Sequence, residues 1–147
     1  MKRSPTVAAI VLVLAGAAFA HSGVKNAVVK ARMDSMSAIA AEMKTLGQMA
    51  KGTVAFDAGA AKVAATAIAN HAADIPVIFE PEEDDPKSQA KAEIWDNFGD
   101  FTAKSERLES LALELSDSIA TESDLPSAMK SLGAACQACH KDYREEK

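Results

Sequence analysis

The chain has 147 residues, a formal net charge of −5 and only two cysteines. This length suits one domain, and an acidic chain without a basic stripe is not expected to bind nucleic acid. Because the chain is rich in alanine, has only 5% aromatic residues and lacks runs of β-branched residues between turns, we expect an all-α protein.

The first twenty residues are organised like a secretory signal sequence. A basic pair follows Met1, an apolar run occupies residues 7–14, and residues 18–20 read Ala-Phe-Ala, a small-x-small cleavage site. An uncleaved membrane anchor is the alternative, but the apolar run is short for a span of ~20 residues. We therefore expect residues 1–20 to be removed, leaving one domain, residues 21–147, exported to the periplasm without stable membrane insertion.

Two helices are expected in the first half of the mature chain. From about residue 24 to residue 50, apolar or small residues recur at steps of three and four, which predicts one helix face, and Gly52 ends the run. Asp57 is expected to cap a second helix to about Ala72, before Pro76. The predicted face of the first helix comprises Val29, Met33, Met36, Ala40, Met43, Gly47 and Ala50.

A crossover loop and two further helices are expected after that. Residues 74–90 contain three prolines and the acidic cluster at 80–85, which we interpret as a solvated loop, with steering of a basic redox partner as the alternative. A third helix of about 30 residues follows, and Ser123 or Asp124 caps a fourth with Pro126 in its first turn. The third helix presents Trp95, Phe98, Thr102, Ser105, Leu108, Ala112, Leu115 and Ile119. The fourth presents Leu125, Met129, Leu132, Cys136, Cys139 and Tyr143.

Four amphipathic helices with mostly short connections predict an antiparallel up-and-down four-helix bundle. Both cysteines lie on the expected buried face of the fourth helix, one turn apart. Whatever the cysteines bind is therefore expected to pack inside the bundle.

The pentapeptide CQACH, residues 136–140, suggests three kinds of site. Disulfide redox sites of this spacing usually begin a helix after a strand, and none is expected here. Structural zinc needs four ligands, and the histidines at 21 and 71 form no second paired cluster. Covalent haem accounts for every residue, because the two sulfurs match two vinyl groups and the next histidine becomes an axial iron ligand. We therefore predict haem c attached to Cys136 and Cys139, with His140 on the iron.

The second axial position can be narrowed by helix geometry. In an up-and-down bundle, the first and fourth helices run antiparallel, so the start of the first lies beside the end of the fourth. At about 1.5 Å per residue, His140 is roughly 8–10 Å from that end, while Met33 and Met36 lie about 13 and 18 Å into the first helix. Met43 and Met49 lie ~28 Å or more along it. Met33 and Met36 therefore remain as candidates.

The chain resembles the class II c-type cytochromes, the cytochrome c′ family. The resemblance covers essentially the whole mature chain and rests on "CQACHKDYR" at 136–144, "KARMDSMSAIAAEMKTLGQMAKG" at 30–52 and "EIWDNF" at 93–98. It implies an antiparallel four-helix bundle with haem c lodged inside near one end.

The resemblance also implies roles for individual residues. The family's distal residue lies sixteen positions before the glycine of a Lys-Gly pair, and 52 − 16 gives Met36. Arg32 is expected to pair with a haem propionate, or else with Asp34 or another surface acid. Arg144 is expected beside the haem and His140, or else as a cation that favours the helix dipole.

The resemblance finally implies a function. A methionine on the iron is typical of the low-spin branch of the family, and methionine–histidine ligation leaves little room for substrate. We therefore expect a non-enzymatic carrier of single electrons among periplasmic redox proteins of unknown identity, either a monomer or a homodimer. The alternatives are a five-coordinate cytochrome c′ that binds nitric oxide or carbon monoxide, and a haem-free helical metal-binding or stress protein.

Overall fold

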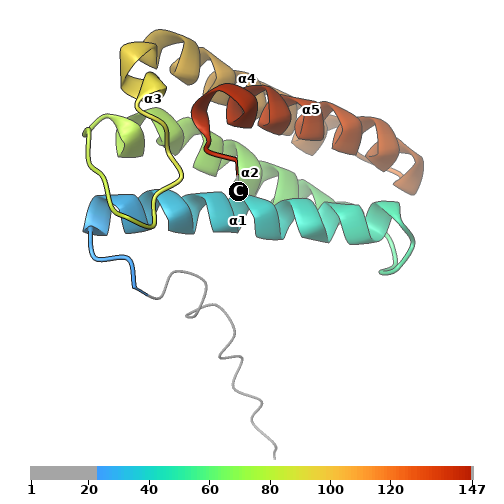
Figure 1. The fold of residues 1–147 in the computed structure, drawn as a ribbon. Helices are drawn as coiled ribbons and strands as arrows, with labels where there is room; N and C mark the ends of the chain where they lie inside the picture. The colour runs from blue at the N-terminus through green and yellow to red at the C-terminus, as the bar shows by residue number, and fades with distance from the viewer. Residues whose placement is uncertain (1–22, 147) are drawn as a thin grey trace, which may run out of the picture.

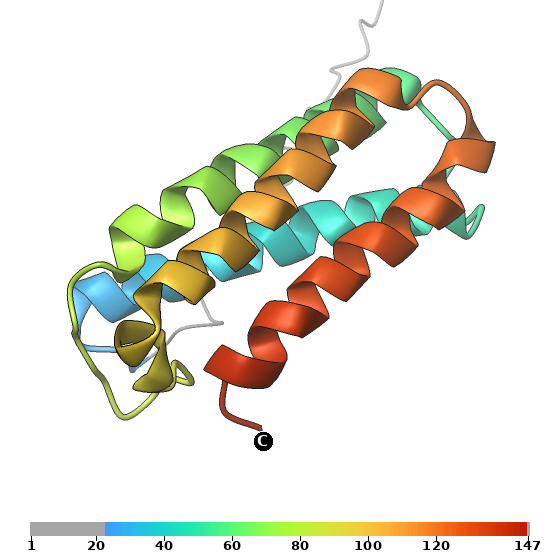
Figure 2. The ribbon, with the colours of Figure 1, turned by 90° about the horizontal axis from the view of Figure 1, so that it is seen from above.

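The computed structural model describes residues 23–146, and the predicted signal sequence lies outside the described residues. Four long helices lie side by side, and consecutive long helices run in opposite directions (Figures 1 and 2). The predicted all-α antiparallel bundle is therefore confirmed. Within the described residues, no helix is both long and apolar enough to span a membrane. The elements are α1 (Ala27–Ala50), α2 (Ala58–Phe79), α3 (Glu93–Asp96), α4 (Phe98–Ser118), the 3-10 turn η1 (Glu122–Asp124) and α5 (Leu125–Tyr143).

The first helix buries a different stripe from the one predicted. Asn26 caps α1, and its side-chain oxygen accepts hydrogen bonds from the backbone N–H groups of Val28 and Val29. Most of the predicted face is only half-buried, and Ala40 is exposed, because α1 packs mainly against α2. The predicted face therefore forms one flank of the helix. The fully buried stripe is Val29, Arg32, Ile39, Leu46 and Met49.

The second helix is longer than predicted. Asp57 caps it as expected, accepting a hydrogen bond from the Ala60 N–H. The helix then continues to Phe79 and contains Pro76, where the sequence pattern suggested an end. A proline ring inside a helix removes one hydrogen bond and crowds the preceding turn. Here Ile75 and Phe79 are both buried in the core, which offsets that cost.

The predicted third helix is broken. Asn97 has non-helical dihedral angles (φ −129°, ψ 41°) and separates the short α3 from α4. The break lets α3 turn toward the core. Ile94 is buried there, and the indole N–H of Trp95 donates to the Phe79 carbonyl at 2.8 Å. The expected buried face is largely confirmed in α4, where Ser105 and Leu108 are among the buried residues.

The fourth predicted helix, α5, begins after Asp124 with Pro126 in its first turn, as expected. The Asp124 carboxylate caps the preceding η1 turn, accepting from the N–H groups of Ala120 and Thr121. Its expected inner face is confirmed: Leu125, Leu132 and Tyr143 are buried, while Met129, Cys136 and Cys139 are half-buried against the core.

The acidic loop is not simply solvated, as the sequence suggested. Asp85 is buried, and its carboxylate accepts hydrogen bonds from the backbone N–H groups of Lys25, Asn26 and Lys87 at 2.8–3.1 Å. The Glu83 carboxylate accepts from the Asn26 side chain. The loop therefore holds the start of α1 in place.

Replacing Asp85 with asparagine is expected to lower stability at neutral pH and to flatten its acid dependence. The N–H groups of Lys87, Lys25 and Asn26 lower the pKa of the Asp85 carboxyl. Its contribution to stability is therefore present above the ordinary value of 3.8 and lost as the pH falls through the lowered folded-state value. Urea unfolding at several pH values measures this. Asp84→Asn, on an exposed neighbour, is the control, and parallel acid profiles for Asp85→Asn and the parent would contradict the assignment.

Candidate functional site

The residues of the predicted haem motif lie on the last turns of α5. Cys136 and Cys139 are free thiols, half-buried, and pack against the hydrophobic core. His140 is exposed and lines a surface hollow together with Lys141 and Arg144. The helix thus presents two sulfurs toward the interior and an imidazole beside them.

The protonation of these groups suits ligation better than thiol exchange. Burial raises the pKa of the Cys139 thiol to about 11 and also raises that of Cys136, whereas redox-active cysteines have lowered values. Partial burial, followed by the charge of Arg144, lowers the pKa of His140. The lowered pKa favours the neutral imidazole, in which a ring nitrogen can bind a metal.

Counting along α1 and α5 from one neighbouring pair of residues puts Met36 at about the height of His140. A Cβ atom on Gly47 would lie 3.5 Å from the Met129 Cε atom, so these two residues face each other across the helices. Because the helices are antiparallel, moving toward the start of α1 and toward the end of α5 follows the bundle axis in the same direction. Eleven residues before Gly47 is Met36, and eleven residues after Met129 is His140. Eleven residues are about three helical turns, so both also lie close to the facing sides.

The other candidate methionine fits this register less well. Counting 47 − 14 reaches Met33, and 129 + 14 reaches Tyr143, one helical turn beyond the imidazole. Met36 packs against the hydrophobic core, and Met33 is not among the residues packed there. The packing of Met36 against the core therefore favours Met36, and the count from Gly47 and Met129 agrees with it.

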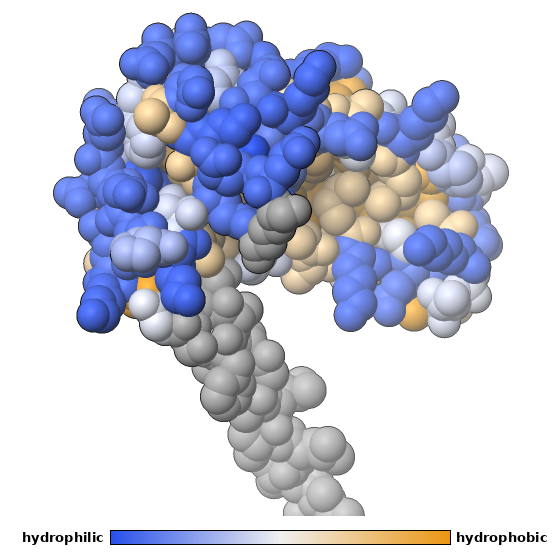
Figure 3. Space-filling view, viewed as in Figure 1, coloured by the Kyte–Doolittle hydropathy of each residue, from blue (hydrophilic) through white to orange (hydrophobic). Residues whose placement is uncertain are grey.

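The space between α1 and α5 is apolar. These two helices make far fewer contacts with each other than α2 makes with α4. Figure 3 shows an apolar hollow over these two helices. Half-buried side chains from both helices supply it: Met36 and Met43 from α1, and Met129, Ala135, Cys136 and Cys139 from α5. Two thiols, a neutral imidazole and a thioether beside an apolar crevice are the donors and surroundings that a haem c requires.

Arg32 is committed to the protein backbone. Its guanidinium donates to the carbonyl oxygens of Ile78, Pro81 and Glu83. The guanidinium also lies over the rings of Phe79 and Trp95, 4.9 and 5.2 Å from their centroids. Only 3% of the residue is exposed. All three guanidinium nitrogens are engaged, so Arg32 locks the end of α2 and the following loop to α1, and its pairing with a propionate stays a prediction.

Replacing Arg32 with methionine is expected to lower the free energy of unfolding by about 2–4 kcal/mol, because buried carbonyl oxygens lose their donors. Chemical denaturation of the haem-loaded protein measures the change. Arg107→Met removes an exposed arginine from α4 and serves as the matched control. Equal effects for the two variants would show that the buried guanidinium has no special structural role.

Arg144 lies at the end of α5, close enough to His140 for its charge to lower the histidine pKa. Its Nε and Nη2 atoms donate to the Gln89 Oε1 atom at 3.2 and 2.8 Å. The structure thus brings Arg144 beside His140, while its donors hold the loop before α3.

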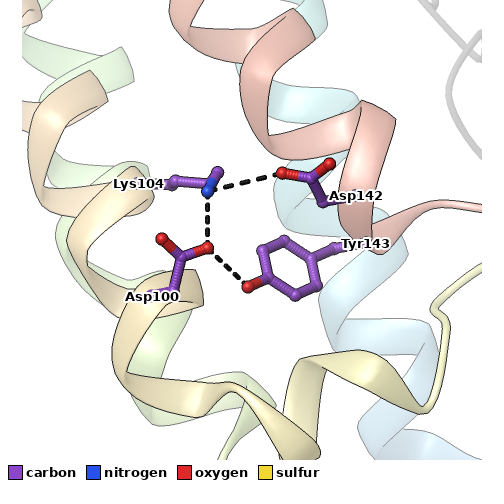
Figure 4. A network of polar contacts seen from close by, with 4 residues as sticks. All are labelled: Asp100, Lys104, Asp142 and Tyr143. Carbon is purple, nitrogen blue, oxygen red and sulfur yellow. Dashed lines mark hydrogen bonds and ion pairs between the residues drawn. The ribbon is translucent and has the colours of Figure 1, made fainter.

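A polar network near the motif was not predicted from the sequence, although Tyr143 itself was expected on the inner face of the last helix. Asp100, Lys104, Asp142 and Tyr143 form one network between α4 and the end of α5 (Figure 4). The four-residue spacing of Asp100 and Lys104 is a sequence signal for one pair, but nothing local points to the contacts across helices. Within residues 23–146, no group of three or more His, Cys, Asp or Glu side chains could hold a metal ion without haem.

Comparisons with known proteins find relatives that match most of the chain. A family model described as Cytochrome C' matches residues 27–144. The chain is 37% identical over 134 residues to a cytochrome c-556 of Agrobacterium fabrum, covering 90% of this chain and 88% of the relative. It is 33% identical over 129 residues to a cytochrome c′ of Cereibacter sphaeroides, covering 80% and 82%. A solved cytochrome c′ of Rhodopseudomonas palustris has a TM-score of 0.77 at 23% identity, over 84% of this chain and 99% of that one, which supports the fold alone.

Proposed function

Because the chain belongs to the cytochrome c′ family, a class of c-type cytochromes with covalently attached haem c, we propose that it carries single electrons with His140 and Met36 as the two axial ligands. The observation that carries this proposal is the packing of Met36, together with Cys136 and Cys139, against the hydrophobic core, where Met33 is not among the packed residues. Haem c supplies one-electron chemistry when bound, since its iron alternates between the ferrous and ferric states.

In this proposal each residue has a distinct task. Cys136 and Cys139 hold the group covalently, so that it stays with the protein in both oxidation states. The imidazole of His140 would bind the iron from α5, and the Met36 thioether would bind it from α1. The apolar crevice between the two helices excludes water, and methionine–histidine ligation raises the reduction potential. With both axial positions filled, no site remains for a substrate.

The relatives support a c-type cytochrome and include proteins named cytochrome c-556 and cytochrome c′. The second candidate function, binding of nitric oxide or carbon monoxide at a five-coordinate iron, is favoured by the relatives of the c′ name. In that case Met36 only covers the iron. We further propose a periplasmic location and electron exchange with another periplasmic redox protein, since the first twenty residues match a secretory signal.

Optical spectroscopy of the purified, haem-loaded protein separates the two candidates. The oxidised protein is expected to show a methionine-to-iron charge-transfer band, and carbon monoxide added to the reduced protein is expected to leave the spectrum unchanged. A high-spin oxidised spectrum with immediate binding of carbon monoxide would establish the gas-binding alternative.

A further inference from the structure

The last turn of α5 is tied to α4 by side chains from both helices (Figure 4). The Lys104 ammonium pairs with Asp100 one turn earlier on α4 and with Asp142 on α5, at 3.4 Å from the second carboxylate. The Tyr143 hydroxyl donates to the same Asp100 carboxylate at 2.6 Å. One cation thus stands between two carboxylates that belong to different helices.

The cation of this network is more covered than its two carboxylates. The Lys104 side chain is only 23% exposed, while those of Asp100 and Asp142 are 56% and 48% exposed. The ammonium also lies 5.6 Å from the centroid of the Tyr143 ring, and that ring is buried edge-on against Phe101. A covered cation is screened less by solvent than one at the surface.

The network lies next to the haem-binding residues. The charges of Lys104, Asp100 and Asp142 all act on the Cys139 thiol, whose sulfur is one of the two proposed attachment points. Asp142 and Tyr143 follow His140 by two and three residues. Any rotation of this turn about the helix axis therefore moves the imidazole as well.

The opposite side of the same turn is held by backbone hydrogen bonds. The Lys91 N–H donates to the Tyr143 carbonyl at 3.1 Å, and the Glu145 N–H donates to the Gln89 carbonyl at 2.8 Å. These bonds fix where α5 ends along its axis. The contacts of Lys104 and Tyr143 with α4 fix how the turn is rotated.

We infer that Lys104 is a positioning residue for His140: by joining Asp142 to Asp100 on α4, it sets the orientation of the imidazole ring toward the haem iron. Without this cation, the carboxylates of Asp100 and Asp142 lose the positive charge that they share, and their repulsion turns the end of α5 away from α4. The inference rests on the proposed axial role of His140. It does not depend on Met36.

The test compares proton NMR spectra of oxidised, haem-loaded Lys104→Met, Lys104→Arg and Lys30→Met with the parent. The shifts of the haem methyl groups caused by the unpaired iron electron report the orientation of the axial imidazole plane, which a mere loss of global stability does not change. Lys30 forms an exposed four-residue-spaced pair with Asp34 on α1, and its replacement is the matched control.

Lys104→Met is expected to alter the order and spread of the haem methyl shifts, whereas Lys104→Arg and Lys30→Met keep the parent pattern. Amide exchange of Arg144, whose N–H donates to the His140 carbonyl, is expected to be several-fold faster in Lys104→Met. An unchanged shift pattern in Lys104→Met would overturn the inference. If that variant does not fold, Tyr143→Phe, which removes only one hydroxyl from the network, is held to the same criterion.

Recording the optical spectrum of each variant keeps the two proposals separate. A charge-transfer band missing from the parent would reject Met36 ligation while leaving the comparison of imidazole orientation intact. If the parent shows the charge-transfer band and all variants have identical methyl shifts, the role of Lys104 is rejected and the ligation by Met36 is not.

Discussion

Replacing both Cys136 and Cys139 with serine is expected to abolish covalent haem completely. A serine hydroxyl does not form the thioether that joins a cysteine to a haem vinyl group, and the chain has no other cysteine to substitute. Protein matured with a cytochrome c assembly system, denatured and extracted with acidified organic solvent, gives the result directly. The parent polypeptide keeps its red colour, and the double variant loses it.

The single variants are the matched controls. Cys136→Ser and Cys139→Ser each leave one sulfur on the half-buried face of α5, so each is expected to retain haem through one thioether. The pyridine haemochrome spectrum distinguishes one remaining vinyl group from two. Extraction of the colour from the parent itself would contradict covalent attachment, and with it the role of both cysteines.

Replacing Met36 with leucine is expected to have the second largest effect. Leucine is close to methionine in volume, so the packing cost is expected to stay below about 1.5 kcal/mol. Without the thioether, the oxidised iron becomes high-spin and five-coordinate, the reduced form gains affinity for carbon monoxide, and the reduction potential falls. Optical titration with carbon monoxide and a potentiometric titration measure these changes.

Met33→Leu, on the same helix one turn earlier, is the control for this experiment and is expected to retain the parent spectrum and potential. If Met33→Leu instead makes the iron five-coordinate while Met36→Leu does not, then the register derived from the contact between Gly47 and Met129 is wrong. If neither variant changes the spectrum, methionine is not an axial ligand at all.

The fold and the haem motif were accessible from the sequence because their signals are local. Apolar residues at steps of three and four predict helices whatever lies elsewhere in the chain, and a CxxCH motif contains its sulfurs and imidazole within five residues. The capping role of Asp57 is a similar local signal and was correctly assigned.

The parts that the sequence did not predict depend on distant contacts. Arg32 finds its acceptors about fifty residues later, and Asp85 finds two of its donors sixty and fifty-nine residues earlier. Pro76 stays helical because Ile75 and Phe79 are buried by other helices. No pattern in one segment carries information about such partners, and Lys104 with Asp142 is a further case.

The placement of Met36 illustrates how the two kinds of information combine. Helix lengths alone left Met33 and Met36 open, and only the resemblance to the cytochrome c′ family selected between them. The structure supplies a separate reason, since Met36 packs against the hydrophobic core and Met33 is not among the residues packed there.

Proton NMR of the reduced, haem-loaded protein tests the central claim most directly. A porphyrin ring current shifts the methyl group of an axial methionine far outside the ordinary methyl range. One methionine methyl resonance is predicted to appear there, to persist in Met33→Leu and to vanish in Met36→Leu. The absence of such a resonance from the parent, or its survival in Met36→Leu, would contradict an iron held between His140 and Met36.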